Sequence, residues 1–170
     1  MEARAKLLGH PIHQMLIVFP LGLLGMSLFF DLIALIWQFP SLYLASYSMI
    51  AAGIITGLIA AGFGFIDFLG IPSGTRAKRV GMMHGAGNVV VVLLFIVSWS
   101  LRVEAPGNPS LLAILISAIG VGIALVTGWL GGELVIRLAI GVDEGAHPDA
   151  PSSLSGRPAI ERDSREANAG

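Results

Sequence analysis

Cysteine is absent from this chain, and charged residues are scarce. Without a cysteine among its 170 residues, the protein forms no disulfide and offers no thiolate for an iron–sulfur cluster or for nucleophilic catalysis. Charged residues make up 12% of the sequence, whereas soluble domains usually carry about 25%. Apolar residues make up 55%, and the mean hydropathy is +0.82. These values exclude an ordinary soluble domain and indicate an integral membrane protein.

Four apolar stretches are long enough to cross a bilayer, which takes about 20 residues of helix. Lipid offers the backbone no hydrogen-bond partners, so each stretch is predicted to be helical. Short connections make successive helices antiparallel neighbours. The predicted fold is therefore an all-α, up-down-up-down four-helix transmembrane bundle within residues 1–143. The predicted spans are His13–Trp37, Ser46–Leu69, Met82–Leu101 and Ser110–Arg137.

Residues 144–170 differ in composition from the membrane domain. They are polar, rich in proline, serine and alanine, and without apolar periodicity, so we predict a disordered tail. His147 belongs to this tail and is expected to be solvated rather than a ligand. The first apolar stretch is too long for a cleaved signal peptide and contains Asp31, so we interpret it as a retained first helix.

Basic residues are distributed unevenly between the two ends of the predicted bundle. Only Arg102 falls on the side of the first loop, and by the positive-inside rule both termini are predicted to be cytoplasmic. The short cluster Arg76, Lys78 and Arg79 is explained by this topology and by anionic lipid, so the bilayer rather than a nucleic acid is the expected partner. The basic residues on the predicted cytoplasmic side are Arg4, Lys6, Arg76, Lys78, Arg79, Arg137, Arg157, Arg162 and Arg165.

The two halves of the membrane domain share a pattern. His13 and His84 each open an apolar stretch, and aligning them places Asp31 opposite Arg102. The second stretch of each half carries one carboxylate shortly after a Gly-aromatic pair. We therefore interpret the chain as two repeated helical hairpins, related by an axis along the membrane normal. We also predict a partly dry ion pair between Asp31 and Arg102, the alternative being that Arg102 extends to the outer headgroups.

Glycines recur at small-x-x-x-small spacing in three of the apolar stretches. The patterns are Gly53–Gly57, Gly81–Gly85 and Gly128–Gly132. Such spacing lets helices approach closely, either within the bundle or in a homo-oligomer. Packing within the bundle is the preferred interpretation.

Ionisable side chains converge on the predicted cytoplasmic end of the bundle. His10 and His13 are three residues apart and share a face if this turn is helical. One interpretation is a site for haem b or a transition metal, with facing histidines as ligands and the carboxylates as further ligands or as groups that orient the rings. The others are proton or ion handling by the carboxylates and a purely structural network. The candidate residues are His10, His13, His84, Asp67 and Glu133.

Several strings in the chain resemble a bacterial family of small predicted membrane proteins, catalogued as domain of unknown function 2231. The resemblance covers about residues 7 to 143 and rests on Gly9–Leu23, Phe30–Leu32, Ile71–Arg79, His84 and Gly128–Val135. Gln14 stands where many relatives carry proline, which alters the entry into the first helix. The family has no established activity. Some relatives carry the same domain beside a Rieske or cytochrome domain, which implies a redox setting.

The resulting expectation is a multi-pass protein of the bacterial inner membrane that binds haem b or a transition metal and supports electron transfer or a redox partner. The chain contains no Rieske or cytochrome c domain, so that partner would be a separate protein. The alternative is a non-enzymatic scaffold, or a small-ion or proton conduit, in which the His and carboxylate cluster is structural. The sequence assigns no catalytic residue.

Overall fold

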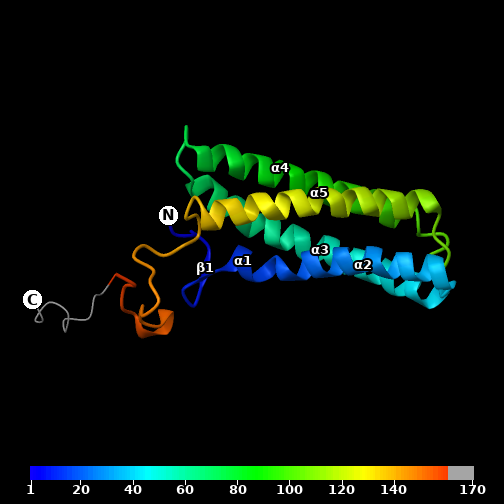
Figure 1. Cartoon of the computed structure of the whole chain (residues 1–170), viewed down its shortest axis with the longest axis horizontal. Coiled ribbons are helices and arrows are strands. Elements are labelled where there is room, and N and C mark those ends of the chain that lie inside the picture. The colour runs from blue at the N-terminus through cyan, green and yellow to red at the C-terminus, as the bar shows by residue number, and fades with distance from the viewer. Residues whose placement is uncertain (161–170) are drawn as a thin grey trace, which may run out of the picture.

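The computed structural model describes residues 1–160, and residues 161–170 lie outside this description. Figure 1 shows long helices side by side, with the α2–α3 and α4–α5 connections at one end (the loop end) and the N-terminus and the α3–α4 connection at the other (the terminal end). All four spans are long and apolar enough to cross a membrane. The predicted transmembrane bundle is confirmed. Its elements are β1 (Lys6–Leu7), β2 (His10–Pro11), α1 (Ile12–Leu16), α2 (Val18–Trp37), α3 (Pro40–Gly70), α4 (Arg76–Ser100), α5 (Leu111–Ile136) and the 3-10 helix η1 (Ser153–Ser155).

The first span, Ile12–Trp37, is interrupted near its start. α1 ends at Leu16 and α2 begins at Val18, with Ile17 between them. Pro20 has no amide hydrogen to donate to the carbonyl of Leu16, and its ring crowds that carbonyl in a regular helix. The proline therefore explains why a short separate helix carries His13.

Two helices begin earlier than the apolar pattern predicts. α3 starts at Pro40, where proline is favoured because the first turn needs no amide hydrogen from it. α4 starts at Arg76, after Thr75 accepts the amide hydrogen of Lys78 at 3.1 Å. The predicted starts are Ser46 and Met82. A proline in the first turn of α3 and the Thr75 cap of α4, rather than hydropathy, thus mark where these two helices begin.

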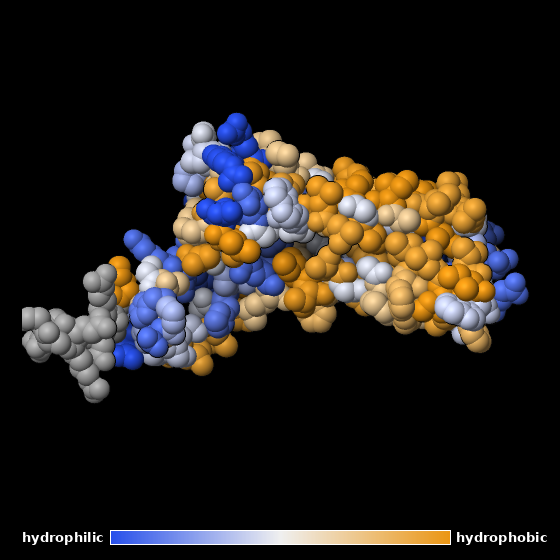
Figure 2. Space-filling view, in the orientation of Figure 1, coloured by the Kyte–Doolittle hydropathy of each residue, from blue (hydrophilic) through white to orange (hydrophobic). Residues whose placement is uncertain are grey.

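The lateral surface of the bundle is apolar. Figure 2 shows hydrophobic side chains over most of its length, with hydrophilic residues gathered at the two ends. Large apolar side chains in mid-helix are exposed, such as Ile59 (51%), Leu93 (56%) and Leu125 (69%). A patch of this size on a soluble monomer would cause aggregation, whereas in a bilayer it is the surface that lipid covers.

The hairpins α2–α3 and α4–α5 repeat the same contacts. Leu24 packs onto Gly53 in the first hairpin, and Phe95 packs onto Gly120 in the second. A Cβ atom at Gly53 would lie 2.5 Å from Leu24 Cδ2, and one at Gly120 would lie 2.9 Å from Phe95 Cε2. The corresponding residues are 71 positions apart on α2 and α4, and 67 positions apart on α3 and α5. The predicted repeat of two helical hairpins is confirmed.

An apolar layer fills the middle of the bundle. Leu24, Ile50, Val91 and Phe95 are buried there and contact one another. His13 and His84 come before Leu24 and Val91 of this layer in their hairpins, toward the terminal end, whereas Arg102 comes after Phe95 at the loop end. The layer therefore separates the two groups of ionisable side chains.

Arg102 lies fully buried two residues after the end of α4 and forms an ion pair with Asp31 of α2. Its Nη2 donates to Asp31 Oδ2 at 2.7 Å, and its Nη1 donates to Oδ1 at 2.9 Å. The other three N–H groups donate to the hydroxyls of Ser46 (3.3 Å), Ser98 (3.3 Å) and Ser117 (3.2 Å). Since a guanidinium has five N–H donors, every one of them finds an acceptor. The predicted pair is confirmed, and with both side chains at 0% exposure it is completely dry.

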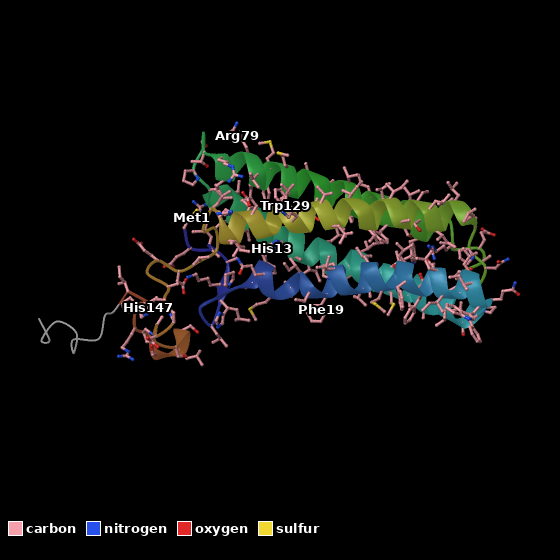
Figure 3. The ribbon with its side chains drawn as sticks, in the orientation of Figure 1. Met1, His13, Phe19, Arg79, Trp129 and His147 are labelled. Carbon is pink, nitrogen blue, oxygen red and sulfur yellow. The ribbon has the colours of Figure 1, made fainter. Side chains whose placement is uncertain are left out.

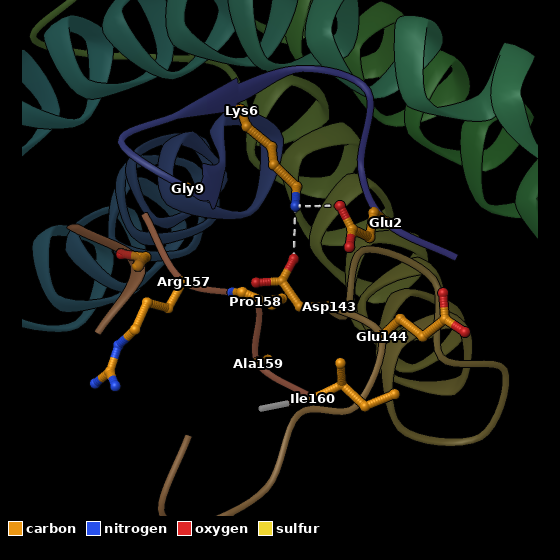
Figure 4. A pocket seen from close by; sticks show the side chains of 10 residues that line it. Glu2, Lys6, Gly9, Asp143, Glu144, Arg157, Pro158, Ala159 and Ile160 are labelled. Atoms are coloured by element: carbon orange, nitrogen blue, oxygen red, sulfur yellow. Dashed lines mark hydrogen bonds and ion pairs between the residues drawn. The ribbon is translucent and has the colours of Figure 1, made fainter. Parts of the chain in front are cut away.

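The N-terminal segment folds over the terminal end and meets the segment that follows α5. Lys6 Nζ forms ion pairs with Glu2 (2.8 Å) and Asp143 (2.5 Å) at the wall of a cleft of about 500 Å³ (Figure 4). Its hydrogen bonds to Asp143 and Glu2 raise the pKa of Lys6. The hydrogen bond from the Lys6 ammonium in turn lowers the pKa of the Glu2 carboxyl. These contacts cover the terminal end of the bundle with charged, membrane-surface residues.

Residues 144–160 continue this cover. They form turns and η1, and Ser153 packs against Gly9 of the N-terminal segment. The disorder predicted for residues 144–170 stays a prediction, and residues 161–170 of that tail lie outside the described residues.

Candidate functional site

His13 and His84 meet between the two hairpins, toward the terminal end. His13, labelled in Figure 3, comes from α1, and His84 comes from α4. Their ring centroids are 6.3 Å apart, and the ring planes are perpendicular. The structure thus brings together the two histidines that the sequence repeat predicts to be equivalent.

Each of the two rings is held by a backbone carbonyl of the second helix of its own hairpin. His13 Nδ1 lies 2.8 Å from the carbonyl oxygen of Ala60, and His84 Nδ1 lies 2.8 Å from that of Thr127. A carbonyl oxygen only accepts, so Nδ1 carries the proton in both rings and Nε2 of a neutral ring is the nitrogen with a free lone pair. Ala60 and Thr127 are 67 positions apart, as the repeat requires.

Glycines make room for both rings. A Cβ atom at Gly64 would lie 2.8 Å from His13 Nδ1, and one at Gly131 would lie 3.1 Å from His84 Cε1. Both glycines come one turn after the carbonyl that holds the ring. The close approach of ring to helix therefore depends on the absence of a side chain at these two positions.

Replacing Gly64 with alanine is expected to displace the His13 ring and weaken its hydrogen bond to Ala60. Overpacking of this kind destabilises by about 1–3 kcal/mol. Gly62→Ala is the matched control, because a Cβ there meets nothing within 4 Å, and the better helix propensity of alanine makes that change neutral or stabilising by up to about 1 kcal/mol. Thermal unfolding in mild detergent measures both. Equal effects of the two substitutions would contradict the steric role of Gly64.

The two histidines differ in their second contact. Nδ2 of Asn88 lies 3.2 Å from His84 Nε2, and Asn88 Oδ1 accepts a hydrogen bond of 3.0 Å from Thr127 Oγ1. Among residues 1–160, His13 Nε2 makes no such hydrogen bond. Asn88 comes four residues after His84 in the sequence, but nothing in the sequence identifies Thr127, whose backbone carbonyl holds the His84 ring.

The two carboxylates do not orient the histidines, and this expectation is corrected. Asp67 Oδ1 accepts the backbone N–H groups of Arg4 (2.7 Å) and Ala5 (3.0 Å), and so fastens the N-terminal segment to α3. Glu133 Oε1 accepts from Arg76 Nη2 at 2.6 Å and joins α5 to α4. The backbone carbonyls described above hold the rings instead.

The predicted equivalence of Asp67 and Glu133 is also wrong in register. The packing of α3 and α5 relates residues 67 positions apart, which pairs Asp67 with Leu134 rather than with Glu133. On a helix with 3.6 residues per turn, a displacement of one residue rotates the side chain by about 100°. The two acids therefore point to different surroundings.

His10 lies outside the helix that carries His13. It belongs to β2, its side chain is exposed, and its Nε2 lies 3.5 Å from Ser153 Oγ. The expected shared helix face does not form, because the helix begins only at Ile12. Within residues 1–160, no group of three or more His, Asp or Glu side chains is placed to hold a metal ion. Of the five candidate residues, His13 and His84 face each other, whereas His10, Asp67 and Glu133 have other partners.

The separation of the two rings suits a metal ion that both imidazoles bind. Rings that bind one metal ion from opposite sides through Nε2, at about 2.0–2.1 Å each, have centres about 6 Å apart, and the observed separation is 6.3 Å. A metal-binding histidine commonly donates its other N–H to a carbonyl or carboxylate, as both rings do here. The residues present therefore fit a two-histidine site.

The family model described as "Predicted membrane protein (DUF2231)" matches residues 9–144, a range that contains both hairpins and the histidine pair. No curated protein and no solved structure matches the chain.

Proposed function

The chain belongs to this family of predicted membrane proteins, and we propose that it is a multi-pass protein of the bacterial inner membrane that holds haem b or a transition-metal ion between His13 and His84, in support of electron transfer. The observation that carries the proposal is the histidine pair, 6.3 Å apart, with each Nδ1 committed to a carbonyl and Nε2 left as the ligand atom. Such preorientation is what an axial or metal-binding histidine requires.

Haem b fits this donor set better than a bare ion. Haem iron would need only two ligands from the protein, and His13 and His84 would supply them. A bare ion needs further protein ligands, and residues 1–160 offer no third His, Asp or Glu beside the pair. When bound, haem iron supplies one-electron redox chemistry. The chain's own residues would hold the rings in place and surround them with a largely apolar bundle.

Any electron donor or acceptor would be a separate protein. A homo-oligomer is a further proposal, supported by Gly128 and Gly132, where an added Cβ would meet no atom within 4 Å. This open glycine pair lets a neighbouring helix approach closely. By contrast, Gly53 and Gly81 pack within the bundle.

The proposed topology places the terminal end in the cytoplasm, since it carries most of the basic residues. A reporter fused after Gly170 is then expected to be cytoplasmic, and a reporter inserted near Ser41 in the α2–α3 connection is expected to be external. Paired fusions of alkaline phosphatase, active outside, and a fluorescent protein, active inside, measure both positions. An external C-terminus would place the histidine pair near the opposite membrane face and contradict this topology.

The absorption spectrum and metal content of the purified protein test the proposed function. Expression with adequate haem precursor and trace metals is expected to yield a Soret band, or stoichiometric metal without that band if a bare ion is the cofactor. A protein that carries neither, and binds neither when hemin or metal is added, overturns the proposal.

The alternative is a scaffold in which the cluster is structural. It is favoured by the hydrogen bond that Asn88 makes to His84 Nε2 and by the separate partners of Asp67 and Glu133, because these groups are then satisfied without a cofactor. A proton or ion conduit is less well supported. The buried layer of Leu24, Ile50, Val91 and Phe95 interrupts any polar path between the histidines and Arg102.

A further inference from the structure

Asn88 occupies the nitrogen of His84 that a cofactor would need. It lies one turn after His84 on α4, and its Nδ2 contacts both the carbonyl oxygen of His84 (2.9 Å) and Nε2 (3.2 Å). Since His84 Nδ1 donates to Thr127, Nε2 has no proton and accepts from the Asn88 amide. Thr127 Oγ1 donates to Asn88 Oδ1 at 3.0 Å and holds the amide in this orientation.

The first hairpin has no counterpart of this arrangement. The repeat relates Asn88 to Ile17 and Thr127 to Ala60, and neither of these has a polar side chain. The histidine, the carbonyl that holds it and the glycine beneath the ring are present in both hairpins. The amide and its hydroxyl anchor are present in the second alone, so the two ligand nitrogens are unequal.

We propose that Asn88 is a displaceable plug on the histidine pair: its amide occupies His84 Nε2 and must move away before a cofactor can bind that nitrogen. This inference rests on the proposed function. His13 Nε2 would be the readily available ligand for haem iron or a metal ion, because it accepts no hydrogen bond from a described residue. His84 Nε2 would become available only once the Asn88 amide had moved away from it. The plug lowers the affinity of the site and keeps the lone pair of His84 satisfied while no cofactor is bound.

A merely structural Asn88 makes a different prediction. If the amide only stiffens the bundle, its removal loosens the histidine pair and weakens cofactor binding. If the amide competes with the cofactor, its removal strengthens binding. The sign of the change in affinity therefore separates the two roles.

Titration of cofactor-free protein in mild detergent with hemin, and in parallel with Zn²⁺, tests the plug. Asn88→Leu keeps the approximate volume and removes the amide. We expect it to bind about 2- to 10-fold more tightly than the wild type, as when one neutral hydrogen bond no longer has to be broken. Thr127→Val removes the anchor alone, and a smaller gain is expected. Asn108→Leu, in the α4–α5 connection, is the matched control and should leave affinity unchanged.

Nitrogen-15 spectra of the histidine rings provide a readout that needs no cofactor. The wild type is expected to show His84 with Nδ1 protonated and Nε2 hydrogen-bonded, and Asn88→Leu should shift only that Nε2 signal toward the free form. If the wild type binds hemin or Zn²⁺ and Asn88→Leu binds it with equal or lower affinity, the plug is overturned and the proposed function stands. Absence of hemin and Zn²⁺ binding in every variant overturns the proposed function, and the plug with it.

Discussion

Replacing either Asp31 or Arg102 alone with alanine is expected to destabilise the protein by about 3–5 kcal/mol, the usual cost of leaving one partner of a buried ion pair uncompensated. Both side chains have 0% exposure, so water does not reach the charge that remains. The loss of Arg102 also removes donors from the hydroxyls of Ser46, Ser98 and Ser117. Because those hydroxyls come from three different helices, we expect the loop end of the bundle to loosen as a unit.

The double variant Asp31→Ala with Arg102→Ala should lose less stability than the two single variants lose together, because it leaves no unpaired charge. Reversible unfolding in mixed detergent micelles measures all three. Arg79→Ala is the control, since Arg79 is exposed and surface substitutions usually change stability by less than about 0.5 kcal/mol. Strictly additive losses would contradict a direct interaction, despite the short distances.

Replacing His13 or His84 with alanine is expected to abolish bound haem or metal while the helical content stays unchanged. The pair offers one ligand nitrogen from each hairpin, and no third His, Asp or Glu of residues 1–160 is placed to substitute for a lost ring. The Soret absorbance or metal content of the purified variants measures the loss, and circular dichroism reports the fold. Full cofactor occupancy in both variants would show that the histidines are not the ligands.

Asp67→Asn and Glu133→Gln supply the matched controls for these histidine variants. The two carboxylates bind the amides of Arg4 and Ala5 and the guanidinium of Arg76, not the rings. We therefore expect cofactor occupancy to stay at the wild-type level in both variants. A carboxylate that did orient a ligating histidine would instead weaken binding by about 10- to 100-fold on substitution.

The pairing of Asp31 with Arg102 could be predicted from the sequence because both residues keep the spacing of the repeat. Asp31 follows His13 by as many residues as Arg102 follows His84. Because the rise per residue is the same in all α-helices, the two side chains are expected at the same depth. An isolated charge at that depth in an apolar segment is costly, so a partner of opposite charge at the same depth is the expected solution. The contribution of Ser46, Ser98 and Ser117 could not be foreseen, because it depends on which faces of the helices turn inward.

The role assigned to Asp67 and Glu133 shows the limit of the same reasoning. Aligning the two acids by the preceding Gly-aromatic pair pairs each α3 residue with the α5 residue one position before its structural equivalent. The structural register is determined by where Leu24 and Phe95 fit against Gly53 and Gly120. Steric fit between helices is not encoded in the hydropathy of either helix taken alone.

The sequence by itself determined the membrane class, the four spans, the repeated hairpin and the positions of His13 and His84, since these follow from apolar length and spacing along one chain. Only the tertiary structure decided what the histidines bind. Their partners are the backbone carbonyls of Ala60 and Thr127. Because every residue has a backbone carbonyl, the residue type at these positions does not predict the contact. Such a contact arises where a glycine lets a neighbouring ring approach the helix, and that depends on how the two helices pack.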